Sequence, residues 1–478
     1  MDELVRRIWD RDHTLWKPQP TEIVDRLGWL TIADAMRPRI RELERFADRV
    51  SVDGFDVALL LGMGGSSLAP EVFSRTFGNG GTRVEVLDTT HPAAVAAAEA
   101  HLDLERTLFL VASKSGTTIE TRSHLDRFWH LTGGDGRRFV AITDPGTPLE
   151  ELARERGFRS VFLAPPDVGG RYSAMSVFGL VPAALVRAPL ERLLDGAVEM
   201  AEACRREEGN PGFALGEAIG GAARVGADKL TFVLPEVIAS FGDWIEQLVA
   251  ESTGKKGTGI VPVVGEDVGP PEVYGDDRFF VAYGEDPPDL GIRVDDGARE
   301  SLGAEMFRWE FATAVAGHLL RVNPFDQPDV AAAKKATSAA LEEGYEDPGF
   351  DDLGPLLERV RPGGYLAIQA FLQPSEETRE ALQRARIALR DRLKVATTLG
   401  FGPRFLHSTG QLHKGGPDTV VCVQVVDEER DVDVEIPGRP YTFGKLIDAQ
   451  ALGDLRALRA AGRRAARVTL DTLTKEAS

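Results

Sequence analysis

Hydroxyl side chains gather in one short segment, between an apolar run and a helix-like pattern. The apolar run 108–112 has the length of a strand buried on both faces, and an amphipathic helical pattern resumes after residue 118. The segment between them offers hydroxyl donors and a glycine that lets the backbone turn close to a ligand: Ser113, Ser115, Gly116, Thr117 and Thr118. These residue types predict a phosphate site, although plain helix capping uses the same types.

The same segment has the spacing of a helix start. Thr117 and Glu120 stand at capping-box spacing, so we expect the segment to open onto a helix N-terminus. Free backbone N–H groups and the positive end of the helix dipole attract anions there. The expected helix start therefore supports the phosphate interpretation.

A glycine-rich turn, GMGGSS at residues 62–67, follows the predicted strand 57–61 and precedes a predicted helix. It fits a dinucleotide fingerprint poorly, because Ser67 stands where the third glycine of GxGxxG is expected. A Walker A loop is excluded, since no GK[ST] follows. Ser66 and the backbone N–H groups of the turn suit a sugar or its phosphate better than a nicotinamide cofactor.

Two further segments carry side chains suited to stabilising charge and moving a proton. Arg171 follows Gly170 in a GG pair, where the backbone can approach a ligand and a fixed guanidinium could stabilise an oxyanion. Gln247 and Glu251 are four residues apart in a predicted helix over 240–252, so they share one face. In isolation each would be read as a surface residue. Beside two candidate phosphate turns, Glu251 becomes a candidate general base.

The segment 405–416 contains His407, His413 and Lys414 among glycines and hydrogen-bonding residues, which is more typical of a site than of packing. Two histidines six apart lack further ligands nearby, so the pattern does not favour a metal site. Cys204 and Cys422 are the only cysteines and are far apart, which gives no disulfide framework.

The elements that must position these residues alternate between strand and helix. Five strand–turn–helix units before residue 200 predict a parallel sheet, with strands at 57–61, 84–87, 108–112, 139–142 and 161–163. A second unit has predicted strands at 230–234 and 279–282 and a helix at 305–320. The tail has predicted strands at 365–371 and 420–426. We expect a helical lead-in over 1–50, α/β domains over 51–200 and 201–340, and an α/β extension over 341–478.

Composition narrows the classes of function. The 478 residues include 56 basic and 75 acidic side chains, and a formal charge of −19 argues against general binding to nucleic acid or anionic membranes. The chain lacks an apolar run of about eighteen residues that could span a membrane. Its N-terminus, MDELVRRIWDRD, is charged and has no apolar signal core, so we expect a cytoplasmic protein.

Taken together, five motifs in order resemble the phosphoglucose isomerases, over about residues 55 to 340. The motifs are GMGGSSLAP, SKSGTTIET, GGRYSAMSVFG, EQLVAESTGKKG and NPFDQPDVAAAKK. The resemblance implies an α/β fold with two sugar-isomerase (SIS) type three-layer αβα domains and parallel sheets. It also implies reversible isomerisation of glucose 6-phosphate and fructose 6-phosphate through an enediolate, with a sugar phosphate as ligand, no cofactor and a homodimer.

Roles follow from the resemblance position by position. It implies that the phosphate loop 113–118, including Lys114, binds the phosphate through Ser113, Ser115, Thr117 and Thr118, with Ser66 nearby. It implies that Arg171, after Gly170, stabilises the enediolate and that Glu251 moves the proton, with Gln247 beside it. Gln327 would match the family's phosphate-side glutamine, and Lys334 the lysine near the ring oxygen.

One departure concerns the histidine that helps to open the sugar ring in this family. Its usual place holds only His318, in a hydrophobic helix, so we expect His413 to take this role, with His407 as second choice. The lead-in and the loop FLHSTGQLHKGGP further resemble the isomerase half of bifunctional transaldolase/phosphoglucose isomerases. Transaldolase activity is not expected of this sequence.

Two other functions stay open. A phosphosugar-binding regulator is one, although a sensor needs neither Glu251 nor Arg171. The other is a different aldose–ketose phosphosugar isomerase, including the isomerase part of an amidotransferase, for which no glutaminase segment is seen.

Overall fold

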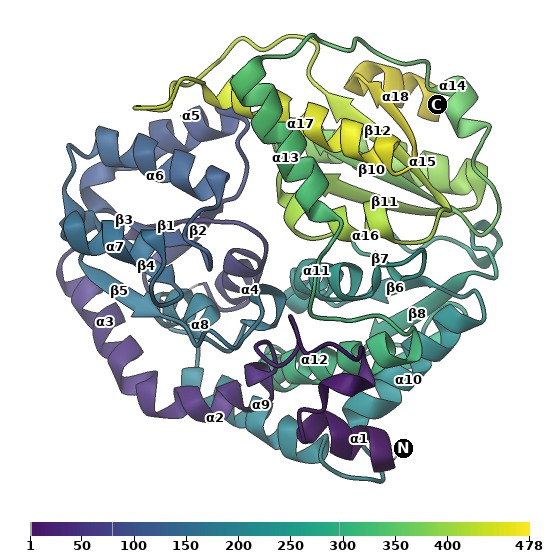
Figure 1. Ribbon diagram of the computed structural model, residues 1–478, viewed down its shortest axis with the longest axis horizontal. Coiled ribbons are helices and arrows are strands. Elements are labelled where there is room, and N and C mark those ends of the chain that lie inside the picture. The colour runs from purple at the N-terminus through teal and green to yellow at the C-terminus, as the bar shows by residue number, and fades with distance from the viewer. Residues whose placement is uncertain (1, 79, 296) are drawn as a thin grey trace.

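The strands form three sheets, and every pair of neighbouring strands within them is parallel. The structure is a computed structural model that describes residues 2–78, 80–295 and 297–478. Helices alternate with the strands around all three sheets (Figure 1), which confirms the predicted α/β class. Among the described residues, no helix combines the length and the apolar character needed to cross a bilayer.

The first sheet contains all five predicted strands, in the order β2-β1-β3-β4-β5. Alternate side chains of β1 enter different cores: Leu60 packs in one, and Leu59 and Leu61 in the other. Burial on both faces explains why β1 and β3 read as continuous apolar runs. The strands are β1 (Val57–Gly62), β2 (Arg83–Leu87), β3 (Thr107–Ala112), β4 (Phe139–Thr143) and β5 (Ser160–Leu163). The associated helices are α4 (Leu68–Phe77), α5 (Pro92–His101), α6 (Ile119–Leu131), α7 (Pro148–Glu155) and α8 (Val177–Leu185).

The second sheet has the order β7-β6-β8-β9. Sequence analysis predicted β6 and β8 but not the two edge strands, which are too short to show a pattern. The strands are β6 (Lys229–Val233), β7 (Val261–Val263), β8 (Arg278–Tyr283) and β9 (Gly291–Val294). The helices are α9 (Leu190–Ala203), α10 (Pro211–Arg224), α11 (Phe241–Thr253) and α12 (Leu302–Leu319). Helix α12 packs against α9, α10 and α11, which explains why it is hydrophobic nearly all round.

The third sheet has the order β11-β10-β12-β13. Its strands are β10 (Tyr365–Phe371), β11 (Ala396–Phe401), β12 (Val420–Val426) and β13 (Arg464–Val468). The helices after residue 329 are α13 (Val330–Glu343), α14 (Gly354–Leu357), α15 (Glu376–Leu393), α16 (Gly410–Gly415), α17 (Phe443–Ala460) and α18 (Leu470–Ala477). Helix α13 packs along α17 (Figure 1), so the predicted boundary at residue 340 falls inside a helix that belongs with the third sheet.

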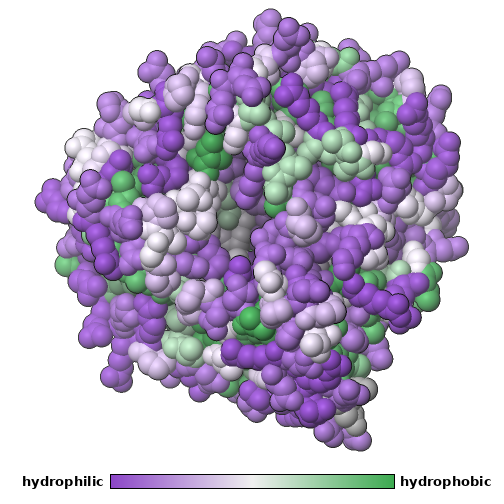
Figure 2. Space-filling model, in the orientation of Figure 1, coloured by the Kyte–Doolittle hydropathy of each residue, from purple (hydrophilic) through white to green (hydrophobic). Residues whose placement is uncertain are grey.

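The lead-in contains α1 (Asp2–Trp9), α2 (Ile32–Met36) and α3 (Ile40–Val52). Its apolar residues, including Trp29 and Met36, join the main core. The three sheets surround the middle of the molecule, and Figure 2 shows a hollow near the centre of one largely hydrophilic face. Segments that follow β1, β3 and β11 carry predicted site residues, as expected where the carboxyl ends of parallel strands meet.

Candidate active site

The hydroxyl-rich segment 113–118 leaves β3 and leads into α6, as predicted. Its side chains bond to one another: Ser113 Oγ lies 2.9 Å from Thr118 Oγ1, and Ser115 Oγ lies 2.9 Å from Thr117 Oγ1. The Gly116 N–H donates to Ser113 Oγ at 3.1 Å, and a φ of 68° at Gly116 requires the freedom of glycine. The turn therefore gathers its hydroxyls in one place at the start of a helix.

A cavity of about 240 Å³ lies beside this segment. Its walls come from the start of α6, from α13, from residues 406–407, and from α16 and α17. Predicted residues in these walls are Ser115, Thr117, Thr118, Lys334 and His407. Glu120, Lys414 and Gln450 also line it, and sequence analysis assigned no part in the site to Glu120 or Gln450.

A second group of predicted residues surrounds the carboxylate of Glu251. Arg171 Nη1 lies 3.2 Å from Glu251 Oε1 and donates at 3.0 Å to Gln327 Oε1. From the preceding turn of α11, the Gln247 amide donates to Glu251 Oε2 at 3.1 Å. The spacing of four residues thus puts amide and carboxylate together, as predicted. This arrangement offers one carboxylate base next to one fixed cation.

Backbone carbonyl groups hold Arg171 in place. Its guanidinium donates to the carbonyl oxygens of Pro324 and Asp326, both at 2.8 Å, and to Ser252 Oγ at 2.9 Å. Lys255 holds the same loop, because its Nζ donates to the Asp326 carbonyl and lies 2.9 Å from the Asp326 carboxylate. Burial, with Arg171 nearby, lowers the pKa of Lys255 to about 7, although Asp326 opposes this shift. Sequence analysis quoted Lys255 within a motif but gave it no role.

His407 joins the two groups. Its backbone carbonyl accepts a 2.8 Å hydrogen bond from the amide of Gln247, and its ring Nε2 lies 3.0 Å from Glu120 Oε1. The same oxygen of Glu120 accepts a 2.7 Å bond from Gln450 Nε2. Burial acts to raise the pKa of Glu120, but His407 and Lys334 hold that pKa below its usual value. A buried, charged carboxylate therefore orients the imidazole.

His413, our first choice for ring opening, lies elsewhere. It is buried in α16, its Nδ1 is 2.8 Å from Gln369 Nε2, and its ring packs beside Phe405 and Tyr365. Burial, with Lys414 and Arg463 nearby, lowers its pKa to about 3. The expected placement of His413 is thus corrected, because the helix turns it towards the third sheet and leaves His407 at the cavity.

The glycine turn after β1 packs against the site's backbone. A Cβ on Gly64, whose φ is 53°, would lie 2.7 Å from the carbonyl oxygen of His407. One on Gly65 would lie 2.1 Å from the carbonyl oxygen of Gly170. These glycines are needed for close approach of three backbone segments. Ser66 lies in this turn, outside the residues that line the cavity.

Two expectations about the phosphate loop need correction. The Lys114 ammonium pairs with the carboxylate of Asp144 and is not among the described residues that line the cavity. The capping box is also wrong: Thr118 caps α6 without a side-chain cap bond to any described residue, and Glu120 turns to His407 and Gln450 instead. Glu120 therefore takes part in the site through its contacts with His407 and Gln450 and not through a capping bond.

The chain is similar in sequence to known glucose-6-phosphate isomerases. The Phosphoglucose isomerase family model matches residues 50–267. A glucose-6-phosphate isomerase of Rubrobacter xylanophilus is 30% identical over 387 residues, which are 64% of this chain and 89% of the relative. That of Thermus thermophilus is 30% identical over 382 residues, 66% of this chain and 90% of the relative.

Among solved structures, a glucose-6-phosphate isomerase from Chlamydia trachomatis has a similar fold. It superposes with a TM-score of 0.60 at 18% identity, covering 72% of this chain and 85% of the other. With nearly the whole length of two relatives matched at 30% identity, the chain belongs to the phosphoglucose isomerase family.

Proposed function

We propose that the protein interconverts glucose 6-phosphate and fructose 6-phosphate by ring opening and a 1,2-proton transfer. The observation that carries the proposal is the pairing of Arg171 with Glu251 at 3.2 Å, with Gln247 on the other carboxylate oxygen. A 1,2-proton shift requires one positioned base and one fixed cation for the enediolate. The names of the relatives agree with this activity.

In the proposed reaction, Glu251 removes the proton from C2 of the open-chain aldose, and the hydroxyl proton on O2 passes to O1 in the enediolate. Glu251 then returns its proton to C1, which leaves the carbonyl at C2. Negative charge develops on the oxygens of the enediolate, and the Arg171 guanidinium stabilises that charge from a position held by backbone carbonyls. Gln247 and Gln327 fix the carboxylate and the guanidinium relative to each other. In this proposal the substrate takes the place of part of the contact between Arg171 and Glu251, while the backbone carbonyls keep the guanidinium in position.

The phosphate binds at the start of α6 in this proposal. Ser113, Ser115, Thr117 and Thr118 exchange their mutual hydrogen bonds for bonds to phosphate oxygens, and the helix N-terminus adds a favourable field. Lys114 orients the loop through Asp144, and Ser66 and Gly170 support the neighbouring turns. Anchoring the phosphate leaves the sugar carbons near the base.

We assign ring opening to His407. With Nε2–H donated to Glu120, Nδ1 is the nitrogen left to accept the proton of the C1 hydroxyl. The C1–O5 bond breaks, C1 becomes the aldehyde carbon, and O5 receives a proton from Lys334, which lines the same cavity. His407 belongs to the same chain as Glu251, so this assignment requires no residue from a partner. We also propose a homodimer, which the resemblance implies, and a cytoplasmic location.

A coupled assay that follows glucose 6-phosphate formed from fructose 6-phosphate tests the activity. Turnover is expected for the unaltered chain, and a loss of at least about a hundredfold for Glu251→Gln, which keeps the shape but removes the base. Binding of either sugar phosphate without turnover would favour the phosphosugar-binding regulator. Full activity of Glu251→Gln would refute the assignment of the base.

A further inference from the structure

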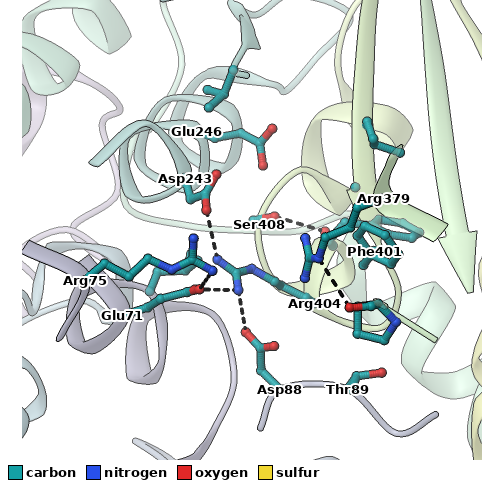
Figure 3. Close-up of a pocket in the computed structure, with 16 residues that line it drawn as sticks. Glu71, Arg75, Asp88, Thr89, Asp243, Glu246, Arg379, Phe401, Arg404 and Ser408 are labelled. Atoms are coloured by element: carbon teal, nitrogen blue, oxygen red, sulfur yellow. Dashed lines mark hydrogen bonds and ion pairs between the residues drawn. The ribbon is translucent and has the colours of Figure 1, made fainter. Parts of the chain in front are cut away.

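The segment 404–408 separates two cavities. Leu406 and His407 line the cavity beside the phosphate loop, whereas Arg404, Phe405 and Ser408 line a second one of about 150 Å³. The second cavity lies where α4, α11, α15 and the end of β11 meet (Figure 3). The position of His407 therefore depends on how the far side of this segment is held.

Arg404 is the centre of an ion-pair cluster on that far side. Its Nη1 lies 2.6 Å from Glu71 Oε2 and 3.2 Å from Asp88 Oδ2, and its Nη2 lies 3.3 Å from Asp243 Oδ2. Figure 3 shows these carboxylates converging on one guanidinium. Glu71 in α4 and Asp88 after β2 belong to the first sheet's unit, Asp243 lies in α11, and Arg404 follows β11 of the third sheet. One side chain thus links three parts of the fold.

Helix α11 connects this cluster to the chemistry. Asp243, Gln247 and Glu251 follow one another at intervals of four, so they share one face of the helix. Asp243 pairs with the side chain of Arg404, Gln247 bonds to the carbonyl of His407, and Glu251 pairs with Arg171. Helix α11, which carries the proposed base, therefore holds the segment 404–408 at two points, Arg404 and His407.

We propose that Arg404 is a positioning residue for ring opening, which locks the segment 404–408 so that His407 faces Glu120 and the substrate cavity. The proposal rests on the role of His407 proposed above. The side chain of Arg404 is 21% exposed, and those of Glu71 and Asp88 are 13% and 12% exposed. Removing the guanidinium would leave the three carboxylates that surround it without their shared cation. The segment 404–408 would then lose the ion pairs that hold it in place.

The same cavity contains a matched control. Arg379 of α15 also lines it, but its guanidinium lies over the ring of Phe401 at 4.7 Å, and its Nε donates to the Pro374 carbonyl at 3.3 Å. No carboxylate among the described residues lies within ion-pair distance of Arg379. Arg379 acts on Glu71, Asp88 and Asp243 only through its charge at longer range, so Arg379→Met removes one charge from the same cavity and breaks none of the ion pairs of Arg404.

The test separates ring opening from proton transfer. Because the open-chain aldehyde recloses to either anomer, ring opening is measured by NMR as exchange between the α and β anomers of glucose 6-phosphate. Proton transfer is measured as deuterium uptake at C2 of erythrose 4-phosphate, an aldose phosphate that cannot cyclise. For Arg404→Met we expect anomer exchange to fall at least about tenfold, with deuterium uptake within about twofold of the unaltered protein.

Arg404→Lys should recover part of the anomer exchange, Asp243→Asn should lower it, and Arg379→Met should leave it unchanged. If Arg404→Met does not fold, the anomer exchange of Arg404→Lys and of Asp243→Asn decides whether the proposal holds. The proposal is overturned if anomer exchange is unchanged in the Arg404 and Asp243 variants, or if both reactions fall in parallel. His407→Ala tests the underlying assignment separately: unchanged anomer exchange there would refute the role of His407 itself.

Discussion

His407 Nε2 lies 3.0 Å from Glu120 Oε1, a contact between residues 287 positions apart in the chain. It connects the segment that follows β11 of the third sheet to α6, the helix that begins at the phosphate loop. His318, the histidine at the position usual for the family, instead points its Nδ1 at the carbonyl of Leu15, 2.8 Å away in the lead-in. The contact therefore supplies an imidazole to the site from a part of the chain that follows the family's motifs.

Replacing His407 by Ala should lower turnover of cyclic glucose 6-phosphate by about a hundredfold or more, because a positioned acid–base group is lost. His413→Asn is the matched control and should stay within a few-fold of the unaltered protein, since that ring packs away from the cavity. Steady-state kinetics on both variants check this. The reverse ranking would restore His413 as the ring-opening residue.

Replacing Glu120 by Gln should reduce kcat by roughly tenfold to a hundredfold and leave KM nearly unchanged. The variant keeps an oxygen for Gln450 but removes the charge that orients the imidazole of His407. Gln450→Glu, which adds a second carboxylate, should be at least as harmful. A rise in KM with unchanged kcat would show that Glu120 serves substrate binding instead.

Ser115→Ala and Thr118→Val should each raise KM by about tenfold, with a smaller change in kcat, because each removes a donor to the phosphate. Inhibition by inorganic phosphate should weaken in parallel. Ser123→Ala, on the buried face of α6 and away from the cavity, provides the control. Unchanged KM and phosphate inhibition would place the phosphate elsewhere.

Buried His413 should make stability fall in acid. Its pKa is about 3 in the folded chain against 6.5 for a free histidine, so between these values the unfolded chain binds more protons. The group's contribution is fully present above pH 6.5 and is lost as pH falls towards 3. At pH 4.5 the loss is on the order of 3 kcal/mol.

Urea unfolding at pH 7 and pH 4.5 measures this effect. In His413→Gln the free energy of unfolding should change less between the two pH values than in the unaltered protein. Identical pH dependence in the two proteins would mean that His413 does not carry the linkage.

Much of the fold could be predicted from local pattern. The strands of the first sheet are apolar because both faces are covered, and glycine and hydroxyl residues mark the turns at their ends. Gln247 and Glu251 share a helix face because of their spacing alone. Strands β7 and β9 were not predicted, because β7 has only three residues and β9 (GIRV) has no run of apolar residues and only one buried side chain.

The sequence by itself therefore determined the α/β class, the hydroxyl-rich turn between β3 and α6 and the motif residues of the family, because these follow from local order along the chain. Only the tertiary structure decided which histidine reaches the cavity, since His407 ends a short 3-10 turn that faces Glu120, whereas His413 lies in the separate helix α16 and faces Gln369. The partners of Glu120, Lys114 and Arg404 were decided in the same way. Lys114 and Asp144 meet at the ends of the neighbouring strands β3 and β4, whereas only the packing of different sheets brings Glu120 to Gln450 and Arg404 to Glu71.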